Sequence, residues 1–219
     1  MSSILGQVAS ALGMNPKYKL YYFDARGRAE PIRWVFAYCG VDYEDIRIAK
    51  ADWPAKKGST PFGQLPYMEV DGQPLAESYA MARYVARKHG AAGADDFEAA
   101  QADAIADYVQ DAAKLLSFMY TESDEKKKSE LKTEFIKTGI QPYLKGFERH
   151  LLKNSNGEAF IVGKNPTWAD FVLVVFLDVL VSMDATVLDN YQPLKAYAQR
   201  VHDLKGIKEW LVKRPVTQF

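Results

Sequence analysis

The residues most able to do chemistry stand together near the start of the chain. Tyr22 closes a short apolar strand pattern, and a glycine turn at Gly27 follows, with Arg26, Arg28 and Arg33 around it. A phenol is a neutral hydrogen-bond donor, and an arginine side chain is permanently charged. A hydroxyl donor beside fixed positive charge suits a site that must hold an anion. The segment therefore predicts an anion-binding site with Tyr22 at its centre.

A second candidate is Leu65-Pro66, directly before an apolar strand pattern. A proline that opens a strand often follows a cis peptide bond. A cis bond here would turn the main-chain N–H and C=O of Leu65 outward, where they could pair with a short peptide as a strand does. The same residues also fit an edge strand with a rigid start and no ligand. This signal alone leaves both interpretations open.

The third candidate is Glu77-Ser78, at the start of a predicted helix. The hydroxyl and N–H of Ser78, together with the helix dipole, could hold an anion. A serine in this place is also a common N-cap with no ligand. A carboxylate such as Glu77 beside an anion site favours a zwitterionic ligand, with one protein group for each ligand charge.

Three carboxylates form a stripe on a later predicted helix. Asp103, Asp107 and Asp111 recur every four residues and so share one face. Such stripes are usually solvated. Like charges at this spacing mildly destabilise a helix, however, so the stripe could instead be kept for a partner.

Alternating strand and helix patterns in the first half of the chain must position these residues. We expect strands over 18–23, 42–48, 67–70 and 73–76, helices over 29–38 and 78–89, and a loop over 49–62. Asp71-Gly72 predicts a two-residue hairpin, and Gly40 predicts a helix C-cap. This order predicts an α/β domain with a mixed four-stranded sheet. It matches a thioredoxin-like unit, although the usual Cys-x-x-Cys is absent.

The second half, after a flexible segment at 90–94, is predicted to be all-α. Helices are expected over 97–120, 125–152, 167–181, 193–202 and 207–213. Pro142 should kink or break the second of these, and Thr167 to Asp170 fit a capping box that starts a central apolar helix. The predicted domains are an N-terminal extension over 1–16, a thioredoxin-like domain over 17–94 and a C-terminal helical bundle over 95–219.

The composition excludes several classes of function. The 28 basic and 28 acidic side chains of this 219-residue chain leave no basic excess for nucleic-acid binding. Three histidines and one cysteine cannot form a zinc site of the usual spacing, and no apolar run is long enough to span a membrane. Cys39 cannot form an internal disulfide, which fits a reducing compartment such as the cytoplasm. We interpret it as a small buried side chain.

Four motifs, in this order and spacing, resemble the soluble glutathione transferases. They cover residues 22–30, 51–54, 61–66 and 167–171. The likeness is strongest to the sigma class, which includes haematopoietic prostaglandin D synthases and S-crystallins, and it extends from about residue 18 to 219. It implies the glutathione transferase fold and a cytoplasmic homodimer with glutathione as co-substrate. The implied activity is conjugation of the glutathione thiolate to apolar electrophiles, as in detoxification.

The resemblance gives each candidate residue a role. Tyr22 would hydrogen-bond the glutathione sulfur, and Arg28 would favour its thiolate form. The other implied glutathione contacts are Trp53, Lys57 and Gln64 around the glycyl carboxylate, Leu65 and Pro66 at the cysteinyl unit, Ser78 at the γ-glutamyl carboxylate, and Asp111 of the partner subunit at the γ-glutamyl ammonium. The implied electrophile pocket is lined by Ala25, Gly27, Ala113, Phe118, Val172 and Phe219.

This chain departs from the sigma pattern in ways that change the expectations. Glu77 replaces the usual glutamine, so its carboxylate could bind the glutathione ammonium itself. Gln110 replaces a carboxylate linked to divalent ions, so we expect no metal. Phe118 and Val172 stand where prostaglandin D synthases typically have tryptophan and tyrosine. The loss of two polar donors favours flat, apolar substrates over an oxygen-rich one.

Other functions of the same fold stay open. The chain could be a prostaglandin D synthase or a non-catalytic, ligand-carrying protein like the S-crystallins, although the insertion that many S-crystallins carry is not evident. It could also resemble the transferase-like interaction modules of translation factors, which are normally fused to other domains. A thiol-disulfide oxidoreductase is disfavoured, because no cysteine lies near Tyr22.

Overall fold

A computed structural model describes residues 16–217 of the chain. It contains two compact units, one of residues 16–92 and 204–217 and one of residues 93–203. The last helix, which the predicted division placed in the helical bundle, thus belongs with the sheet. Apart from Pro16, the expected N-terminal extension lies outside the described residues. Within the described part, no helix is both long and apolar enough to cross a bilayer.

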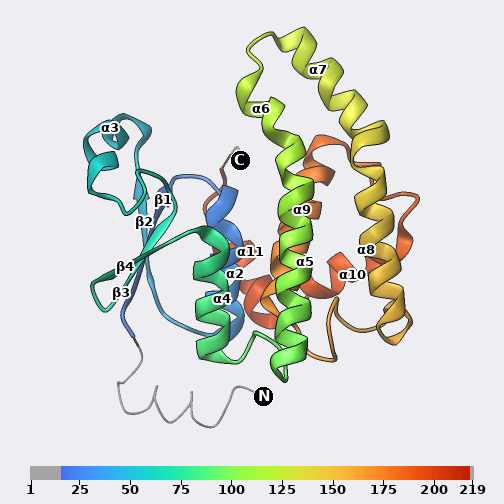
Figure 1. The fold of residues 1–219 in the computed structure, drawn as a ribbon, viewed down its shortest axis with the longest axis horizontal. Coiled ribbons are helices and arrows are strands. Elements are labelled where there is room, and N and C mark those ends of the chain that lie inside the picture. The colour runs from blue at the N-terminus through green and yellow to red at the C-terminus, as the bar shows by residue number, and fades with distance from the viewer. Residues whose placement is uncertain (1–15, 218–219) are drawn as a thin grey trace. The chain divides into compact units, whose positions relative to one another are not determined.

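The first unit is built on a mixed four-stranded sheet (Figure 1), as predicted. The strands are β1 Tyr18–Phe23, β2 Glu44–Ile48, β3 Tyr67–Val70 and β4 Gln73–Ala76. Their order is β2-β1-β3-β4, with β2 parallel to β1 and the other neighbours antiparallel. Helix α2, Glu30–Cys39, packs against α4, Ser78–His89, and against α11, Lys205–Lys213.

The buried side chains of this unit follow the periodicity of the sequence. Ile32, Val35 and Phe36, the predicted apolar face of α2, have no exposed surface, and neither do Leu20 of β1 and Met68 of β3. Alternate residues of a strand and every third or fourth residue of a helix share a face. The turn between β3 and β4 has positive φ at Asp71 and Gly72, as a two-residue hairpin requires.

Two local predictions in this unit were wrong. The segment 49–62, expected to be a loop, contains the short helix α3, Trp53–Lys56, between 3₁₀ turns at Lys50–Asp52 and Lys57–Ser59. Pro54 is compatible with it, because a helix leaves the N–H groups of its first turn unbonded. Ser78 is the first helical residue of α4 and not its cap, a position that Glu77 occupies.

The second unit is helical, as predicted. Its helices are α5 Asp96–Lys114, α6 Phe118–Thr121, α7 Glu125–Glu134, α8 Gln141–Lys153, α9 Trp168–Met183 and α10 Gln192–His202. Helix α9 contacts both α5 and α10, and most of its side chains are buried. A helix that is apolar nearly all round needs such a central place.

The two long helices predicted in this unit are both interrupted. The helix expected over 97–120 ends at Lys114, and a 3₁₀ turn, Leu115–Ser117, leads into α6. The helix expected over 125–152 is broken by a π-helical turn, Phe135–Gly139. It resumes as α8 with Pro142 in its first turn, where a missing N–H does little harm, so the predicted break is confirmed.

Asp170 holds the start of α9. Its fully buried carboxylate accepts hydrogen bonds from the main-chain N–H of Ile161 (2.8 Å) and of Thr167 (2.7 Å), from the Thr167 hydroxyl (3.0 Å) and from the Tyr197 hydroxyl (2.8 Å). Burial raises the pKa of this carboxyl, and the four donors oppose that shift. The buried carboxylate is therefore well matched by its donors.

We expect Asp170→Ala to lower the free energy of unfolding by roughly 3 kcal/mol or more, because it leaves several buried donors without an acceptor. Chemical denaturation measures the loss. Asp189→Ala is the control, since that exposed carboxylate pairs with Lys195 and should cost no more than about 1 kcal/mol. Equal effects of the two substitutions would contradict the assigned role of Asp170.

Candidate active site

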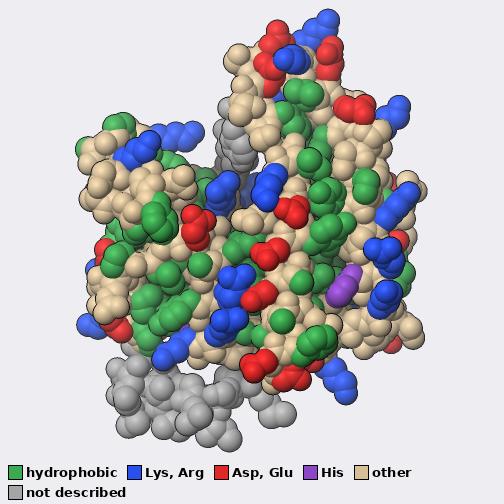
Figure 2. Space-filling view, in the orientation of Figure 1, with side chains coloured by type: hydrophobic (Ala, Val, Ile, Leu, Met, Phe, Trp, Pro, Cys, Tyr) green, Lys and Arg blue, Asp and Glu red, His purple; other side chains and the backbone are tan. Residues whose placement is uncertain are grey.

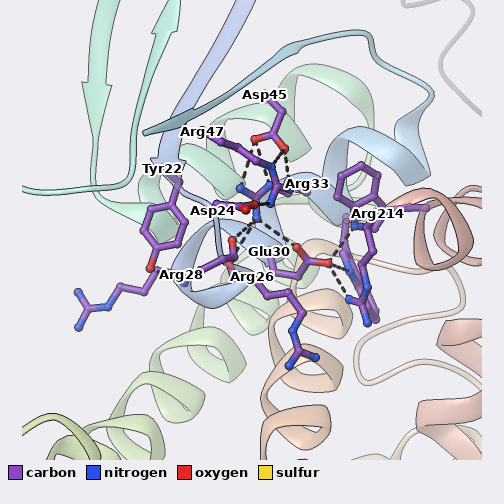
Figure 3. Close-up of polar contacts among 12 residues, drawn as sticks. Tyr22, Asp24, Arg26, Arg28, Glu30, Arg33, Asp45, Arg47 and Arg214 are labelled. Carbon is purple, nitrogen blue, oxygen red and sulfur yellow. Dashed lines mark hydrogen bonds and ion pairs between the residues drawn. The ribbon is translucent and has the colours of Figure 1, made fainter. Parts of the chain in front are cut away.

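Tyr22 lies near the end of β1 and meets the turn that starts α2. The main-chain N–H of Arg28 donates a hydrogen bond of 3.2 Å to the Tyr22 hydroxyl oxygen, and Figure 3 shows the phenol directed toward this turn. A hydroxyl that accepts a bond still has its own proton to donate. The contact therefore ties the Tyr22 hydroxyl to the turn at the start of α2.

Glycine is required at position 27 for this contact. Its φ is +40°, a conformation that other residues rarely adopt, and a Cβ there would lie 2.5 Å from the Tyr22 hydroxyl oxygen. The 3₁₀ turn Gly27–Ala29 then runs directly into α2. The glycine predicted as a turn thus also makes room for the phenol.

A small pocket beside this turn gathers most of the predicted glutathione contacts. It is lined by Arg28, Phe62, Gln64, Leu65, Pro66, Ala76, Glu77 and Ser78. The Leu65–Pro66 peptide bond is cis, which is one of the two interpretations that the sequence left open. Six of these eight residues come from the predicted set, and they derive from three separate stretches of the chain. The fold therefore brings the second and third candidate motifs together next to Arg28.

Glu77 has an unusual backbone at this pocket. Its φ is +68° and its ψ is 114°, outside the regions that suit a residue with a side chain. Such conformations cost about 1–3 kcal/mol and concentrate at functional sites. Ser78 follows at the N-terminus of the twelve-residue helix α4, where unbonded N–H groups and the helix dipole favour an anion.

Trp53 and Lys57 are not among the residues that line the pocket. The Trp53 ring packs edge-on against Phe23, with ring centroids 5.8 Å apart. Lys57 lies alongside Gly63, where a Cβ added to the glycine would be 3.6 Å from Lys57 Cε. Both residues belong to the first unit. Trp53 lies near the end of β1, and Lys57 lies near the segment that precedes Gln64.

The remaining predicted residues are divided between the two units. Ala25 and Gly27 belong to the first, whereas Ala113, Phe118 and Val172 belong to the second. Phe118 packs near Phe135, with ring centroids 6.0 Å apart, and Val172 is only 2% exposed. Phe219 lies outside the described residues. The electrophile pocket therefore stays a prediction.

The acidic stripe lies along α5. Figure 2 shows acidic side chains gathered on that helix, which carries Asp103, Asp107 and Asp111. Asp111 is exposed and accepts a bond of 2.8 Å from Lys114 Nζ of its own chain. Among residues 16–217, no group of three or more metal-ligating side chains is close enough together to hold an ion.

The single cysteine does not contribute a nucleophile here. Burial raises the pKa of the Cys39 thiol to about 12, so it is protonated at neutral pH.

The sequence did not reveal a polar cluster behind Tyr22, which is centred on two buried charged residues, Glu30 and Arg33. It is made of Asp24, Glu30, Arg33, Trp34, Asp45, Arg47, Trp210 and Arg214 (Figure 3). We call it the Glu30 cluster. Glu30 is 1% exposed and Arg33 is 0% exposed. The only sequence signal was that Arg33 falls between the apolar residues Ile32 and Val35 on α2.

A thioredoxin-like sheet with a small polar pocket, in one chain with an all-helical unit, is the architecture of the glutathione transferases. Residues 18–87 match the family described as glutathione S-transferase, N-terminal domain, and residues 110–214 match glutathione S-transferase, C-terminal domain. The chain belongs to the glutathione S-transferase family, whose members are enzymes that use glutathione as co-substrate.

Relatives cover nearly the whole chain. The probable glutathione S-transferase 6 of Caenorhabditis elegans is 38% identical over 208 residues, 92% of this chain and 98% of the relative. The haematopoietic prostaglandin D synthase of Gallus gallus is 41% identical over 202 residues, with the same two coverages. The crystal structure of a monomeric glutathione S-transferase from the hookworm Necator americanus superposes with a TM-score of 0.84 at 37% identity, covering 93% of this chain and all of that one.

Proposed function

We propose that this chain is a sigma-class glutathione transferase that attaches the glutathione thiolate to flat, apolar electrophiles. The observation that carries the proposal is the double role of residue 28. Its N–H holds the Tyr22 hydroxyl, and the same residue lines the pocket of Leu65, Glu77 and Ser78. A tripeptide bound in that pocket would bring its sulfur toward the phenol.

The energy that this site must supply is modest. A free thiol has a pKa of about 8.5, so at neutral pH only a few per cent is thiolate. Making half or more of it thiolate requires a shift of about 1.5–2 units, or roughly 2–3 kcal/mol. A hydrogen bond to a charged group contributes about 1.5–3 kcal/mol. The Tyr22 hydroxyl alone is of the right magnitude, and the Arg28 cation adds to it.

The other proposed contacts are those that the resemblance to the sigma class implies. Trp53 and Lys57 would hold the glycyl carboxylate with Gln64 nearby, and the main chain of Leu65 would pair with the cysteinyl unit. Ser78 would take the γ-glutamyl carboxylate at the start of α4. Glu77 would bind the γ-glutamyl ammonium, shared with Asp111 of the partner subunit.

Ser78→Ala is expected to weaken glutathione binding about three- to tenfold, because it removes one hydrogen bond to a charged group. The N–H groups at the start of α4 remain and offset part of that loss. The pH dependence of the bound thiol should not change, because Ser78 acts on the other end of the tripeptide. Titration calorimetry measures the affinity. Ser129→Ala on α7 is the control for losing an exposed serine hydroxyl, and unchanged affinity in Ser78→Ala would leave Ser78 with no ligand.

A panel of substrates tests the proposed reaction. Glutathione-dependent turnover should be substantial with an aryl halide and poor with prostaglandin H2, because Phe118 and Val172 offer no polar donors. The 41% identity to a haematopoietic prostaglandin D synthase favours isomerisation of prostaglandin H2 as the second candidate. Conversion of prostaglandin H2 that outpaces aryl conjugation would establish that candidate. Binding of glutathione without any turnover would indicate a ligand-carrying protein.

We further propose that the enzyme is a cytoplasmic homodimer with no resident metal. A role for Asp111 of the partner subunit requires two chains, and the single cysteine suits a compartment where glutathione is kept reduced. Light scattering at micromolar concentration tests the assembly. A monomeric state, like that of the Necator americanus relative, would leave Glu77 as the sole carboxylate for the ammonium.

A further inference from the structure

The Glu30 cluster has a fully buried ion pair, Glu30 with Arg33, at the centre of a network of partly exposed charges. Three carboxylates, Asp24, Glu30 and Asp45, meet the guanidinium groups of Arg33, Arg47 and Arg214. Buried ion pairs rarely stabilise a protein more than well-packed apolar side chains would, because desolvation is costly. Stability alone therefore does not explain a cluster of this size. Its contacts extend in two directions.

Toward Tyr22, the cluster holds the main chain of the turn that orients the phenol. Arg33 Nη1 donates to the carbonyl oxygens of Ala25 (2.8 Å) and Arg26 (3.4 Å). Arg47 Nη1 donates to the Asp24 carboxylate (2.7 Å), while its Nε and Nη2 bind Asp45 at 3.0 and 2.9 Å. Residues 24–26 are thus held just before Gly27.

Arg33 also stands directly behind the phenol. Its guanidinium carbon lies 6.0 Å from the centroid of the Tyr22 ring, at the outer limit of a cation–π contact. The same side chain binds Asp45 Oδ1 through Nε and Nη2, each at 3.2 Å. One rigid planar group therefore connects strand β2, the turn before Gly27 and the ring of Tyr22.

In the other direction, the cluster reaches the C-terminal helix. Glu30 Oε1 accepts bonds from Trp34 Nε1 (3.1 Å), Trp210 Nε1 (2.9 Å) and Arg214 Nη1 (2.8 Å), and Oε2 accepts one from Arg33 (3.3 Å). Trp210 and Arg214 are 180 and 184 residues away in sequence. The backbones of α11 and α2 also meet closely, since a Cβ on Gly206 would collide with the carbonyl oxygen of Ala37.

We propose that Glu30 and Arg33 are positioning residues for Tyr22, and that Trp210 and Arg214 extend this support to the C-terminal segment of the chain. Arg33 fixes the carbonyl groups of Ala25 and Arg26, and two residues further on the N–H of Arg28 holds the phenol. Glu30 fixes Arg33, and α11 fixes Glu30. The inference rests on the proposed role of Tyr22 as the donor to the glutathione sulfur.

The expected consequence is specific to thiolate formation. Active-site geometry is sensitive to small shifts, and a displacement of about 1 Å can reduce a rate a hundredfold. A looser turn weakens the bond from Tyr22 to the sulfur, which matters only when the sulfur is charged. The glutathione pocket of Leu65 and Ser78 should keep its affinity, because no residue of the cluster lines it.

The test compares Trp210→Phe and Arg214→Gln with the matched control Lys213→Gln. Lys213 is the exposed neighbour of Arg214 at the end of α11. The apparent pKa in the pH profile of kcat/KM should rise by about 0.5–1 unit in the first two variants, which lowers kcat/KM at about pH 6.5 three- to tenfold and hardly changes it near pH 9. Glutathione affinity should stay within about twofold, and the control should match the unaltered enzyme.

A purely structural role predicts a different result. A lower melting temperature with an unchanged pH profile would overturn the proposal, and so would equal losses at both pH values. Arg33→Lys keeps the positive charge but loses the planar guanidinium that binds Asp45 and the turn together. This variant should also raise the apparent pKa, because the proposal depends on the positions of these bonds. An unchanged pH profile of kcat/KM in Arg33→Lys would contradict this dependence on geometry.

A double variant separates this inference from the proposed function. If the cluster acts through the phenol, Arg214→Gln should cause no further loss of activity in a Tyr22→Phe background. Additive losses would overturn the positioning role while leaving Tyr22 in place. If Tyr22→Phe itself were fully active, the proposed function and this inference would both fall.

Discussion

Tyr22→Phe is expected to lower the rate of glutathione conjugation at about pH 7 tenfold or more, since it removes a hydrogen bond to a charged atom worth about 1.5–3 kcal/mol. The affinity for glutathione should change little. The phenol touches only the sulfur, and its benefit appears only when the sulfur is ionised. Steady-state kinetics with an aryl halide and titration calorimetry with glutathione measure the two quantities.

The neighbouring residue provides the control. Tyr21 lies on the opposite face of β1, where its ring stacks on Tyr67 at 4.4 Å and its hydroxyl bonds Glu69. Tyr21→Phe removes the same atom from the same strand and should leave turnover nearly unchanged. If Tyr22→Phe kept more than about a third of the activity, a charged hydrogen bond at that position would be disproved.

The second large effect is expected from Gly27→Ala. The new Cβ would lie 2.5 Å from the Tyr22 hydroxyl oxygen, and φ at this position is +40°. Either the phenol or the turn has to move, so the bond from the Arg28 N–H to Tyr22 should be lost. We expect turnover to fall about tenfold or more, as in Tyr22→Phe. Kinetics on the purified variant, with circular dichroism to verify folding, measures this outcome.

Gly40→Ala controls for strain alone. Gly40 also has positive φ, at +64°, but a Cβ there would meet nothing within 4 Å. This variant should lose about 1 kcal/mol of stability and keep its turnover. Normal activity in Gly27→Ala, or an equal loss of activity in both variants, would show that steric contact with Tyr22 is not what requires glycine at position 27.

Short-range patterns account for what could be predicted from the sequence. The strands carrying Leu20 and Met68, the apolar face of α2 and the hairpin at Asp71-Gly72 all express periodicities of two or four residues or a local turn preference. The proline that opens β3 and the capping box of Thr167 and Asp170 at the start of α9 are also short motifs. Such features are determined locally, so a single sequence contains them.

The features that were missed depend on contacts that the sequence does not display. Glu30 and Arg33 resemble an exposed helical ion pair until Trp210 and Arg214 cover them from the far end of the chain. The helices that end at Lys114 and Glu134 are not followed directly by a proline or a glycine, the usual sequence signals of a helix end. The positive φ of Glu77 contradicts the preference of its residue type. For Glu30 the deciding contacts come from residues 180 and 184 positions away, which one sequence cannot reveal.

The central claim is that Tyr22 turns bound glutathione into a thiolate at neutral pH. The ultraviolet absorbance of the thiolate, followed across a pH titration of the enzyme–glutathione complex, measures this without any electrophile. A site of the proposed kind predicts a thiol pKa of about 6.5–7 in the unaltered enzyme and a return toward about 8.5 in Tyr22→Phe. A thiol that titrates near about 8.5 in both proteins would contradict it.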